Sequence, residues 1–419
     1  MFRFTDNIIA QTTLQCNLNC KYCYEGSKIK ANKKQMSVSD FKRALDTAIY
    51  QRCILGDKNN KLIWHFHGGE PFLYNWEDFK ECIRYIHRRA KSFPNVTYCV
   101  QSNGLCINKE IAEFFAKEKC SIGISFDGFS TTERMSKEKT KALIENLRNL
   151  KAETGVRFSC LSVFSRANMN NWFVDMISTS DLFDSFGINV LVPSEKTDNL
   201  APTAEEQWKY WLEPCLKSYL TDNPLKERFV NMMVERFFTD VILHTEDTEI
   251  KKTGCFDRIC GRGVNMINID PSLNVHNCDK YLEEGSYICN RYEEPLNSYD
   301  FLGLEQIKRY GEYCKNIFEL EHKTGCNRCY ASNLCLGGCQ SYNLSRYNEY
   351  RLDTTMCDIY KRVFDFLRIN WVEILKHNYI QATKTILGIN PDFLRESTTS
   401  GYYIQIDSDI NTIHMVKEN

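Results

Sequence analysis

The sequence predicts an α/β fold in which a partial (β/α)6 barrel, resembling an incomplete TIM barrel, precedes a small cysteine-rich domain. Three observations predict this fold. Short apolar segments alternate with helical patterns over the first half of the chain, both periodicities weaken in the second half, and cysteines become dense there. Parallel strands joined by right-handed crossovers place their working face at the carboxyl ends of the strands.

Six segments have the length and composition of buried strands. They are 8–13, 62–67, 96–102, 122–126, 157–163 and 187–192. Between them, apolar residues recur at helical spacing after a Ser37-x-x-Asp40 start signal, and again before the fifth strand. These helical positions are Phe41, Ala44, Leu45, Ala48 and Ile49, followed by Leu143, Ile144, Leu147 and Leu150. We therefore expect the barrel to occupy residues 1–193.

The composition changes after Pro193. A polar link leads into helix-like sequence from about Trp208 to His244, which predicts a bridging helical region over 194–254. Residues 255–375 combine weak periodicity with dense cysteine, as is typical of a domain organised by metal, and they end in a helix near 358–375. Residues 376–419 form a polar tail.

Charge and hydropathy exclude several classes of function. The 53 basic and 54 acidic residues leave a net charge of -1, so neither nucleic acid nor an anionic membrane surface is an expected partner. The sequence has neither a leader of signal type nor an apolar run of the ~18 residues that a membrane span needs. We expect a cytoplasmic protein, in which 20 cysteines indicate metal ligation rather than disulfides.

Three cysteines, Cys16, Cys20 and Cys23, follow the first strand directly. Three thiolates at a strand end suit a four-iron cluster in which one iron stays open to a ligand. The alternatives are a zinc knuckle that lacks its fourth ligand and a group of ordinary buried thiols.

This CxxxCxxC loop, with Tyr22 before its last cysteine, resembles the defining motif of the radical S-adenosylmethionine (SAM) superfamily. The resemblance implies that the open iron chelates SAM and that cleavage of SAM gives a 5'-deoxyadenosyl radical, which abstracts a hydrogen atom. The cofactor then carries out the chemistry, and the protein orients and shields it.

Further segments at the strand ends resemble the family's SAM-binding segments. Gly68, Gly69 and Glu70 match its GGEP segment, which implies a contact between the glutamate and the methionine amino group. The other SAM-binding candidates implied by the resemblance are Ser102, Asn103, Ser125 and Arg134. Ser125 and Arg134 are candidates for the ribose and the carboxylate, and the alternative for Arg134 is a solvated surface arginine. We expect His65 and His67 to pack or to bond backbone rather than to bind metal.

A second set of cysteines lies in the second half. Cys326, Cys329, Cys335 and Cys339 are followed by Cys357, and Cys255, Cys260 and Cys278 precede them. As a bare pattern the run also suits zinc. It resembles the SPASM domain, which implies one auxiliary cluster on Cys255, Cys260, Cys278 and Cys339 and another on Cys326, Cys329, Cys335 and Cys357. The chain would then hold three 4Fe-4S clusters.

The sequence departs from the SPASM pattern at Leu273, where that family usually has glycine. We expect the nine remaining cysteines to be mostly small core residues. They are Cys53, Cys82, Cys99, Cys106, Cys120, Cys160, Cys215, Cys289 and Cys314, of which Cys289 and Cys314 are the main candidates for exceptions.

Asp279 follows Cys278 directly, as an aspartate does in the anaerobic sulfatase maturases that this region resembles. That resemblance implies a general base, and a helix or turn cap is the alternative. The sixth strand segment, 187–193, resembles instead the relatives that cross-link ribosomally made peptides. We expect a peptide maturase that forms a carbon-carbon or thioether cross-link, with formylglycine formation on a sulfatase as the alternative. A non-catalytic iron-sulfur electron carrier and a zinc-organised binding module are the rivals from other classes.

The expected partners follow from this interpretation. They are a precursor peptide or protein substrate and an electron donor such as ferredoxin or flavodoxin. Only fifteen residues precede Cys16, so we expect a leader peptide to be recognised by the bridge, the C-terminal tail or a separate leader-binding protein.

Overall fold

The structure is a computed structural model. It describes residues 7–23, 33–54, 61–191, 197–221, 223–238, 266–276, 287–289, 315, 319, 325–332, 334–335, 354–377, 402–407 and 412–417. Within these residues, no helix is both long enough and apolar enough to cross a membrane.

Six parallel strands form an open, curved sheet in chain order. They are β1 (Asn7–Thr13), β2 (Leu62–Gly68), β3 (Val96–Ser102), β4 (Ile122–Ser125), β5 (Phe158–Phe164) and β6 (Phe183–Val190). Each strand pairs with the next in parallel, in the order β6-β5-β4-β3-β2-β1. The predicted α/β fold with a partial barrel is confirmed, and all six predicted strands are present.

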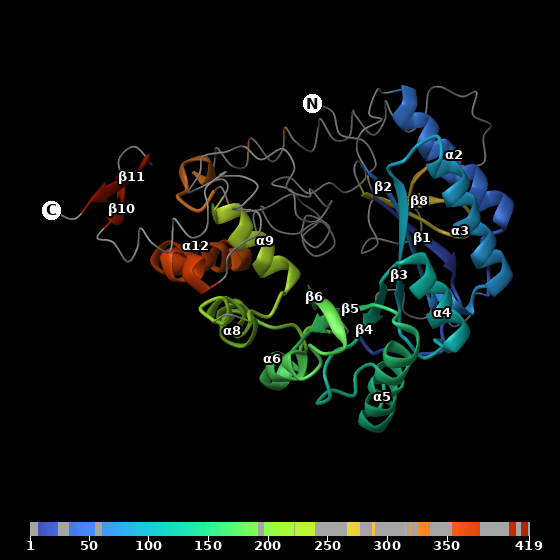
Figure 1. Cartoon of the computed structure of the whole chain (residues 1–419), viewed down its shortest axis with the longest axis horizontal. Helices are drawn as coiled ribbons and strands as arrows, with labels where there is room; N and C mark the ends of the chain where they lie inside the picture. The colour runs from blue at the N-terminus through green and yellow to red at the C-terminus, as the bar shows by residue number, and fades with distance from the viewer. Residues whose placement is uncertain are drawn as a thin grey trace.

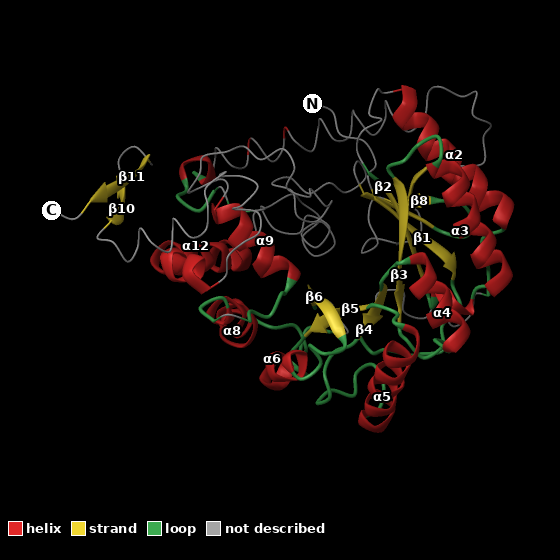
Figure 2. Cartoon of the chain, viewed as in Figure 1, coloured by secondary structure: helices red, strands yellow, loops and turns green. Residues whose placement is uncertain are grey.

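A helix follows each of the first five strands and lies on the outer side of the sheet (Figures 1 and 2). The helices are α2 (Val38–Ile54), α3 (Trp76–Ala90), α4 (Lys109–Glu118), α5 (Lys137–Thr154) and α6 (Met169–Ile177), with a short 3-10 turn, η1 (Pro71–Leu73), before α3. All the apolar positions predicted for α2 and α5 are buried. The hydroxyl of Ser37 accepts a hydrogen bond of 3.0 Å from the backbone N–H of Asp40, which confirms the predicted start of α2.

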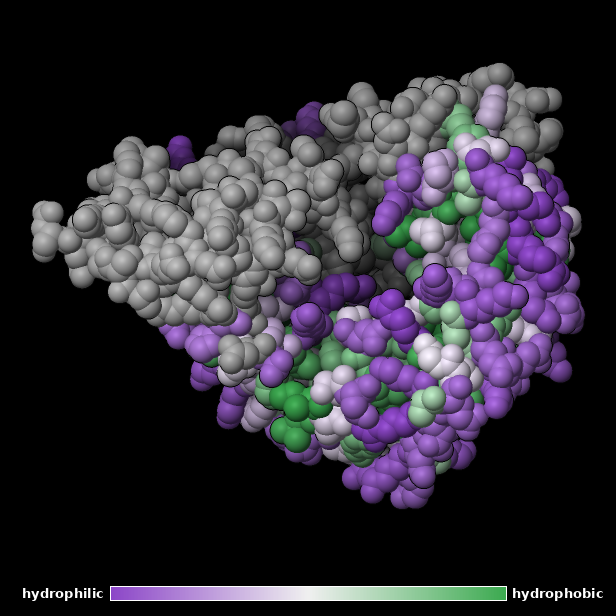
Figure 3. Space-filling view, viewed as in Figure 1, coloured by the Kyte–Doolittle hydropathy of each residue, from purple (hydrophilic) through white to green (hydrophobic). Residues whose placement is uncertain are grey.

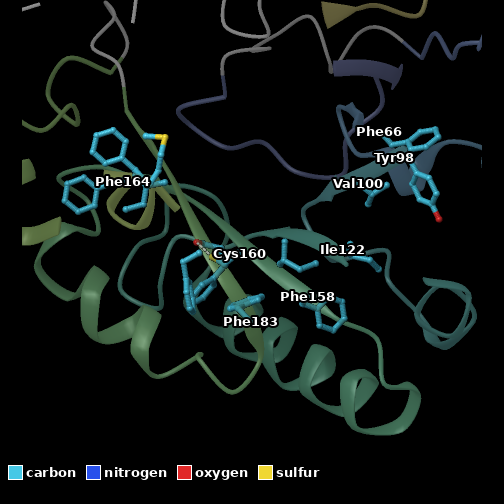
Figure 4. Close-up of a cluster of buried hydrophobic side chains, with 14 of the residues drawn as sticks. Phe66, Tyr98, Val100, Ile122, Phe158, Cys160, Phe164 and Phe183 are labelled. Carbon is cyan, nitrogen blue, oxygen red and sulfur yellow. Dashed lines mark hydrogen bonds between the residues drawn. The ribbon is translucent and has the colours of Figure 1, made fainter. Parts of the chain in front are cut away.

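The core lies between the strands and these helices. Outward-facing residues of the strands, including Phe66, Tyr98, Val100 and Phe158, are buried there (Figure 4). The outer surface of the helical layer is mostly hydrophilic (Figure 3). Because side chains alternate along a strand, the neighbouring residues face the inside of the barrel, and several of them, such as His65 and Cys99, are partly exposed there. We call this inner face of the sheet the barrel lumen.

The sixth strand begins four residues earlier than predicted, at Phe183 rather than Gly187. Its pairing with β5 contains an irregularity, because Phe158 pairs with Phe183 whereas Cys160 pairs with Phe186. This extra residue breaks the alternation of apolar and polar side chains, so the start of the strand has no two-residue period in the sequence.

The sheet continues past the predicted domain boundary at residue 255. Strand β7 (Met266–Ile269) pairs in parallel with β1, and β8 (Val275–His276) and β9 (Tyr287–Cys289) follow in antiparallel order. In the turn between β7 and β8, Leu273 has a φ of 62°, in the left-handed region that favours glycine. This backbone conformation explains why the SPASM pattern usually has glycine at this position. The present chain adopts the same conformation with leucine.

The predicted helical run from Trp208 to His244 is divided. A short helix, α7 (Ala204–Gln207), precedes it, and its described residues form a π-helical turn η2 (Trp208–Leu212), α8 (Glu213–Ser218) and α9 (Arg228–Arg236). Residues 239–244 of the predicted run lie outside the described residues. The last predicted helix is confirmed as α12 (Thr354–His377) and packs on α9 through the ring pair Phe229–Tyr360, whose centroids lie 6.0 Å apart. A 3-10 turn, η4 (Cys326–Arg328), precedes α12, and an antiparallel hairpin of β10 (Tyr402–Asp407) and β11 (Thr412–Lys417) follows it.

Candidate active site

The loop after β1 carries Cys16, Cys20 and Cys23, all partly exposed. Backbone hydrogen bonds hold this loop at two places. The backbone N–H of Lys21 donates to the carbonyl of Glu133 at 2.9 Å, and the backbone N–H of Glu70 donates to the carbonyl of Gln15 at 2.7 Å. The loop is therefore held between the end of β2 and the segment that precedes α5.

The three thiols lie close enough for their charges to interact. Burial raises the pKa of Cys20 to about 11, the guanidinium of Arg134 opposes that shift, and the charges of Cys23 and Cys16 add to it. Among the described residues, no group of three His, Cys, Asp or Glu side chains gathers around a point that would hold a single metal ion. A four-iron cluster needs no such gathering, because each thiolate binds a different iron. Three thiolates on one loop suit the donor set of such a cluster.

Gly68 and Gly69 bring the end of β2 against the cysteine loop. A Cβ at Gly68 would lie 2.1 Å from the carbonyl oxygen of Thr13, and a Cβ at Gly69 would lie 2.2 Å from that of Gln15. Gly68 also has a φ of 131°. Both positions need glycine because of contact with the chain's own backbone, before any contact with a cofactor is considered.

Glu70 is a buried carboxylate, with only 1% of its surface exposed. It accepts hydrogen bonds from the hydroxyl of Ser102 at 2.7 Å, from the N–H of Asn103 at 2.7 Å and from the N–H of Phe72 at 3.2 Å. Burial raises the pKa of Glu70 to about 7 against the opposing effect of these donors. Ser102 and Asn103, predicted to line the SAM site, thus orient Glu70.

Asp127, which follows β4, joins three parts of the site. Its Oδ2 accepts from Nε of Arg134 at 2.9 Å and from the hydroxyl of Tyr22, and its Oδ1 accepts from the N–H of Val163 at 2.7 Å. The side chains of Arg134 and Asp127 are only 13% and 2% exposed, so the interpretation of Arg134 as a solvated surface arginine is wrong. The guanidinium also lies over the ring of Tyr22, 5.6 Å from its centroid. Sequence reasoning missed Asp127 as a site residue, although an Asp-Gly pair at a strand end is a usable signal.

Two more polar links complete the strand ends. Ser125 accepts a hydrogen bond of 2.9 Å from the amide of Gln101. Asn17, inside the cysteine loop, accepts from the amide of Asn103 at 2.7 Å and donates to the sulfur of Cys106 at 3.4 Å. The predicted residues of the first cluster and of its surroundings therefore lie together at one end of the barrel.

The family profile described as the Radical SAM superfamily matches residues 11–164. This interval contains the cysteine loop, Glu70, Asp127 and Arg134. The chain contains a radical SAM domain. Members of this superfamily are enzymes that use a 4Fe-4S cluster and SAM, so the electron-carrier and zinc-module interpretations are wrong.

Alignments with two relatives cover most of this chain. It is 24% identical over 376 residues to the cysteine-type anaerobic sulfatase-maturating enzyme of Clostridium novyi, covering 85% of this chain and 94% of the relative. It is 22% identical to the radical SAM cyclopropyl synthase TigE of Paramaledivibacter caminithermalis, covering 83% and 70%.

Solved structures show the same fold. Native anSMEcpe with bound AdoMet superposes with a TM-score of 0.67 at 18% identity, covering 88% of this chain and 99% of that one. The same protein with bound AdoMet and the Cp18Cys peptide gives 0.66 at 19% identity, covering 89% and 99%. The fold of this radical SAM protein is therefore that of the SPASM-type maturases.

Four of the cysteines predicted to hold auxiliary clusters lie in the described residues. Cys326 begins η4, Cys329 follows its last residue, Cys335 lies further along the chain, and Cys357 lies in the first turn of α12. The charges of Cys357, Cys329 and Cys326 raise the pKa of Lys361, so these three thiols lie near one another. Cys255, Cys260, Cys278, Cys339 and the candidate base Asp279 lie outside the described residues.

Seven of the nine other cysteines fall into two groups. Cys82, Cys160 and Cys215 are buried, as predicted for core residues, whereas Cys53, Cys99, Cys106 and Cys120 are partly exposed. Cys314 and the side chain of Cys289 lie outside what the structure describes. His65 bonds the side chains of Asn7 and Cys99.

Proposed function

We propose that the chain is a radical SAM maturase that forms an intramolecular carbon-carbon or thioether cross-link in a ribosomally synthesised peptide. The similarity to TigE over 83% of the chain carries the proposal, because TigE is a cyclopropyl synthase that belongs to the same superfamily. The similarity in fold to anSMEcpe with a bound peptide supports a peptide as the substrate.

The residues at the strand ends have separate roles in this proposal. Cys16, Cys20 and Cys23 hold the cluster, and the SAM site is formed by Tyr22, Gly68, Gly69, Glu70, Ser102, Asn103, Ser125 and Arg134. When bound, the cluster and SAM supply the radical that removes hydrogen from the substrate. The carboxylate of Glu70 binds the amino group of SAM, and its donors Ser102 and Asn103 hold it in place. Asp127 fixes the orientation of Arg134.

The second half of the chain contributes two auxiliary clusters. Cys255, Cys260, Cys278 and Cys339 hold one, and Cys326, Cys329, Cys335 and Cys357 hold the other. Four thiolates close each cluster, so these clusters transfer electrons rather than bind substrate. Asp279, next to a cluster ligand, acts as the general base. A ferredoxin or flavodoxin supplies electrons, and a separate protein or the tail recognises the leader.

Formylglycine formation on a sulfatase is the second candidate. The similarity to the cysteine-type sulfatase-maturating enzyme favours it, because that alignment covers 94% of the relative. The two candidates share the cluster, SAM and a peptide substrate and differ in the product.

One experiment tests the proposal. The protein is reconstituted without oxygen, supplied with SAM and a strong reductant, and incubated with peptides encoded beside its gene and with a peptide that carries a sulfatase motif. We expect 5'-deoxyadenosine, and a peptide that has lost two hydrogens with a new bond between two residues in its fragmentation spectrum. An aldehyde that reacts with a hydrazide probe would support the second candidate instead. A variant with Cys16, Cys20 and Cys23 changed to alanine is the control and must form neither product.

A further inference from the structure

The barrel lumen contains a thiol outside the strand-end site. Cys99 lies in the middle of β3, in register with His65 of β2, which is in register with Ile9 of β1. Registered residues share a face of the sheet, and the adjacent residues Phe66 and Val100 are buried on the opposite, outer face. Cys99 and His65 therefore point into the lumen, where both are partly exposed.

Three side chains form one hydrogen-bonded line there. The sulfur of Cys99 lies 2.9 Å from Nδ1 of His65, and Nε2 of His65 lies 2.8 Å from Oδ1 of Asn7. The side-chain oxygen Oδ1 of Asn7 can only accept a hydrogen bond, so Nε2 of His65 carries the proton and Nδ1 is the acceptor. The thiol of Cys99 is therefore the donor in its bond to His65.

The surroundings keep this thiol protonated. Burial raises the pKa of Cys99 to about 12. A thiolate, the form that attacks electrophiles and binds metals, is thus disfavoured at neutral pH. A neutral thiol has another reactivity, because its S–H bond is weaker than most C–H bonds and it gives a hydrogen atom to a carbon radical.

The position of Cys99 suits this reactivity. It lies three residues before Ser102 on the same strand, which is about 10 Å along β3 from the end where Glu70 and the cysteine loop meet. Gln101 is the lumen-facing residue between them, and it is also partly exposed. A substrate that extends from the strand ends into the lumen and carries a carbon radical would approach this thiol from the carboxyl end of β3.

We propose that Cys99 is a hydrogen-atom donor that quenches carbon radicals in the barrel lumen, with His65 and Asn7 as its positioning residues. The proposal rests on the proposed function, which supplies the radical. The S–H bond breaks homolytically, a C–H bond forms on the radical carbon, and Cys99 becomes a thiyl radical. One electron from a reduced iron-sulfur protein or flavodoxin and one proton from solvent in the lumen restore the thiol. Substrate radicals that do not go on to form the cross-link are thereby converted back to closed-shell molecules.

The test uses the peptide of the proposed function. Full-length, reconstituted protein is given SAM, dithionite and that peptide in D2O, and the recovered peptide is analysed by mass spectrometry. A thiol hydrogen exchanges with D2O whereas C–H hydrogens of the protein do not, so we expect peptide that wild-type protein returns without a cross-link to carry one deuterium on carbon. In Cys99→Ser the hydroxyl also exchanges but its O–H bond is too strong to donate, so the deuterium should be lost while 5'-deoxyadenosine still forms.

Controls separate this proposal from the proposed function. Cys120→Ser removes a partly exposed thiol that lies by the carbonyl of Ser121 outside the line of Cys99 and His65, and the peptide that it returns should keep the deuterium. Peptide returned by wild-type protein without deuterium, or equal deuterium with Cys99→Ser, overturns the role of Cys99 alone. A wild-type protein that forms no 5'-deoxyadenosine overturns both proposals.

A second measurement does not depend on turnover. Protein without SAM is treated with methyl methanethiosulfonate, and the modified cysteines are mapped by mass spectrometry. Burial raises the pKa of Cys99 to about 12 and that of Cys120 to about 11, so Cys99 holds about tenfold less thiolate and should react about tenfold more slowly. Cys160, which is 4% exposed, should stay unmodified. If Cys99 stays unmodified after exposures far longer than this difference requires, the lumen does not give access to the thiol and the proposal fails.

Discussion

Glu70 and Asp127 are two buried carboxylates at neighbouring strand ends whose surroundings differ. Glu70 accepts only from neutral groups, a hydroxyl and two backbone N–H groups. Asp127 has the guanidinium of Arg134 at 2.9 Å. Burial favours the neutral acid at Glu70, so we expect Glu70 to change its charge near neutral pH.

Binding of SAM should depend on the charge of Glu70. Its pKa of about 7 means that the carboxylate is mostly protonated at about pH 6 and mostly ionised at about pH 8. Only the ionised form attracts the amino group of SAM, so affinity measured by calorimetry should rise across this interval. Glu70→Gln should bind more weakly and lose the rise. An affinity of the wild-type protein that is flat with pH would contradict this role.

Asp127→Asn tests the buried ion pair. It leaves the charge of Arg134 without its partner in a site that is nearly closed to solvent, which should lower the free energy of unfolding by about 3–5 kcal/mol. The matched control is Asp181→Asn, because Asp181 pairs with Arg148 at 2.8 Å with both side chains exposed. That change should cost less than about 1 kcal/mol. Urea denaturation measures both, and equal losses would be evidence against a special role for the buried pair.

At the scale of elements, the end of β2 and the cysteine loop form one unit. The N–H groups of Gly69 and Glu70 donate to the carbonyls of Thr13 and Gln15 at 2.9 and 2.7 Å. The strand thus positions the loop through the backbone, and the proposed ligands Cys16, Cys20 and Cys23 depend on that contact for their placement.

Gly69→Ala should therefore impair the cluster. Its Cβ would lie 2.2 Å from the carbonyl oxygen of Gln15, which must move and take Cys16 with it. We expect less iron per chain after reconstitution and weaker absorbance of the cluster. Gly155→Ala at the end of α5 is the control, because a Cβ there meets nothing within 4 Å and its φ of 73° costs about 1–2 kcal/mol. An unchanged iron content in Gly69→Ala would show that the cysteine loop accommodates the added Cβ, which would contradict this prediction.

At the scale of the molecule, the second half packs on the first in two ways. Strand β7 extends the barrel sheet beside β1, and α12 contacts the bridging helices through the ion pair of Arg362 with Glu205 at 2.7 Å. The cysteines at η4 belong to the same unit as α12, since Ala331 and Leu334 are buried and Tyr330 contacts the ring of Phe364 at 5.3 Å.

The auxiliary cysteines should be separable from radical generation. Changing Cys326, Cys329, Cys335 and Cys357 to alanine should remove about four irons per chain. Cleavage of SAM should persist, because Cys16, Cys20 and Cys23 are untouched. Iron analysis and the yield of 5'-deoxyadenosine measure the two effects. Unchanged iron in this variant would contradict the assignment of these four ligands.

The sequence by itself determined the features that depend on local order. Apolar spacing in one strand or helix is set by its own residues, so the six strands, α2, α5 and α12 were all predicted. The cysteine runs around Cys16 and Cys326 are also visible in the local sequence, and their role as ligands stays a prediction. The start of β6 was missed because its irregular pairing with β5 removes the alternation on which the prediction rests.

Only the tertiary structure decided which distant residues meet. Tyr22, Asp127 and Arg134 join across more than a hundred residues, and so do β1 and β7. Asn7, His65 and Cys99 come into line only because three strands pair in one register. Local sequence patterns do not predict such contacts, because the contacts arise from the crossovers of the chain. Burial then changes the charge state and the reactivity of a side chain, although its neighbours in sequence stay the same.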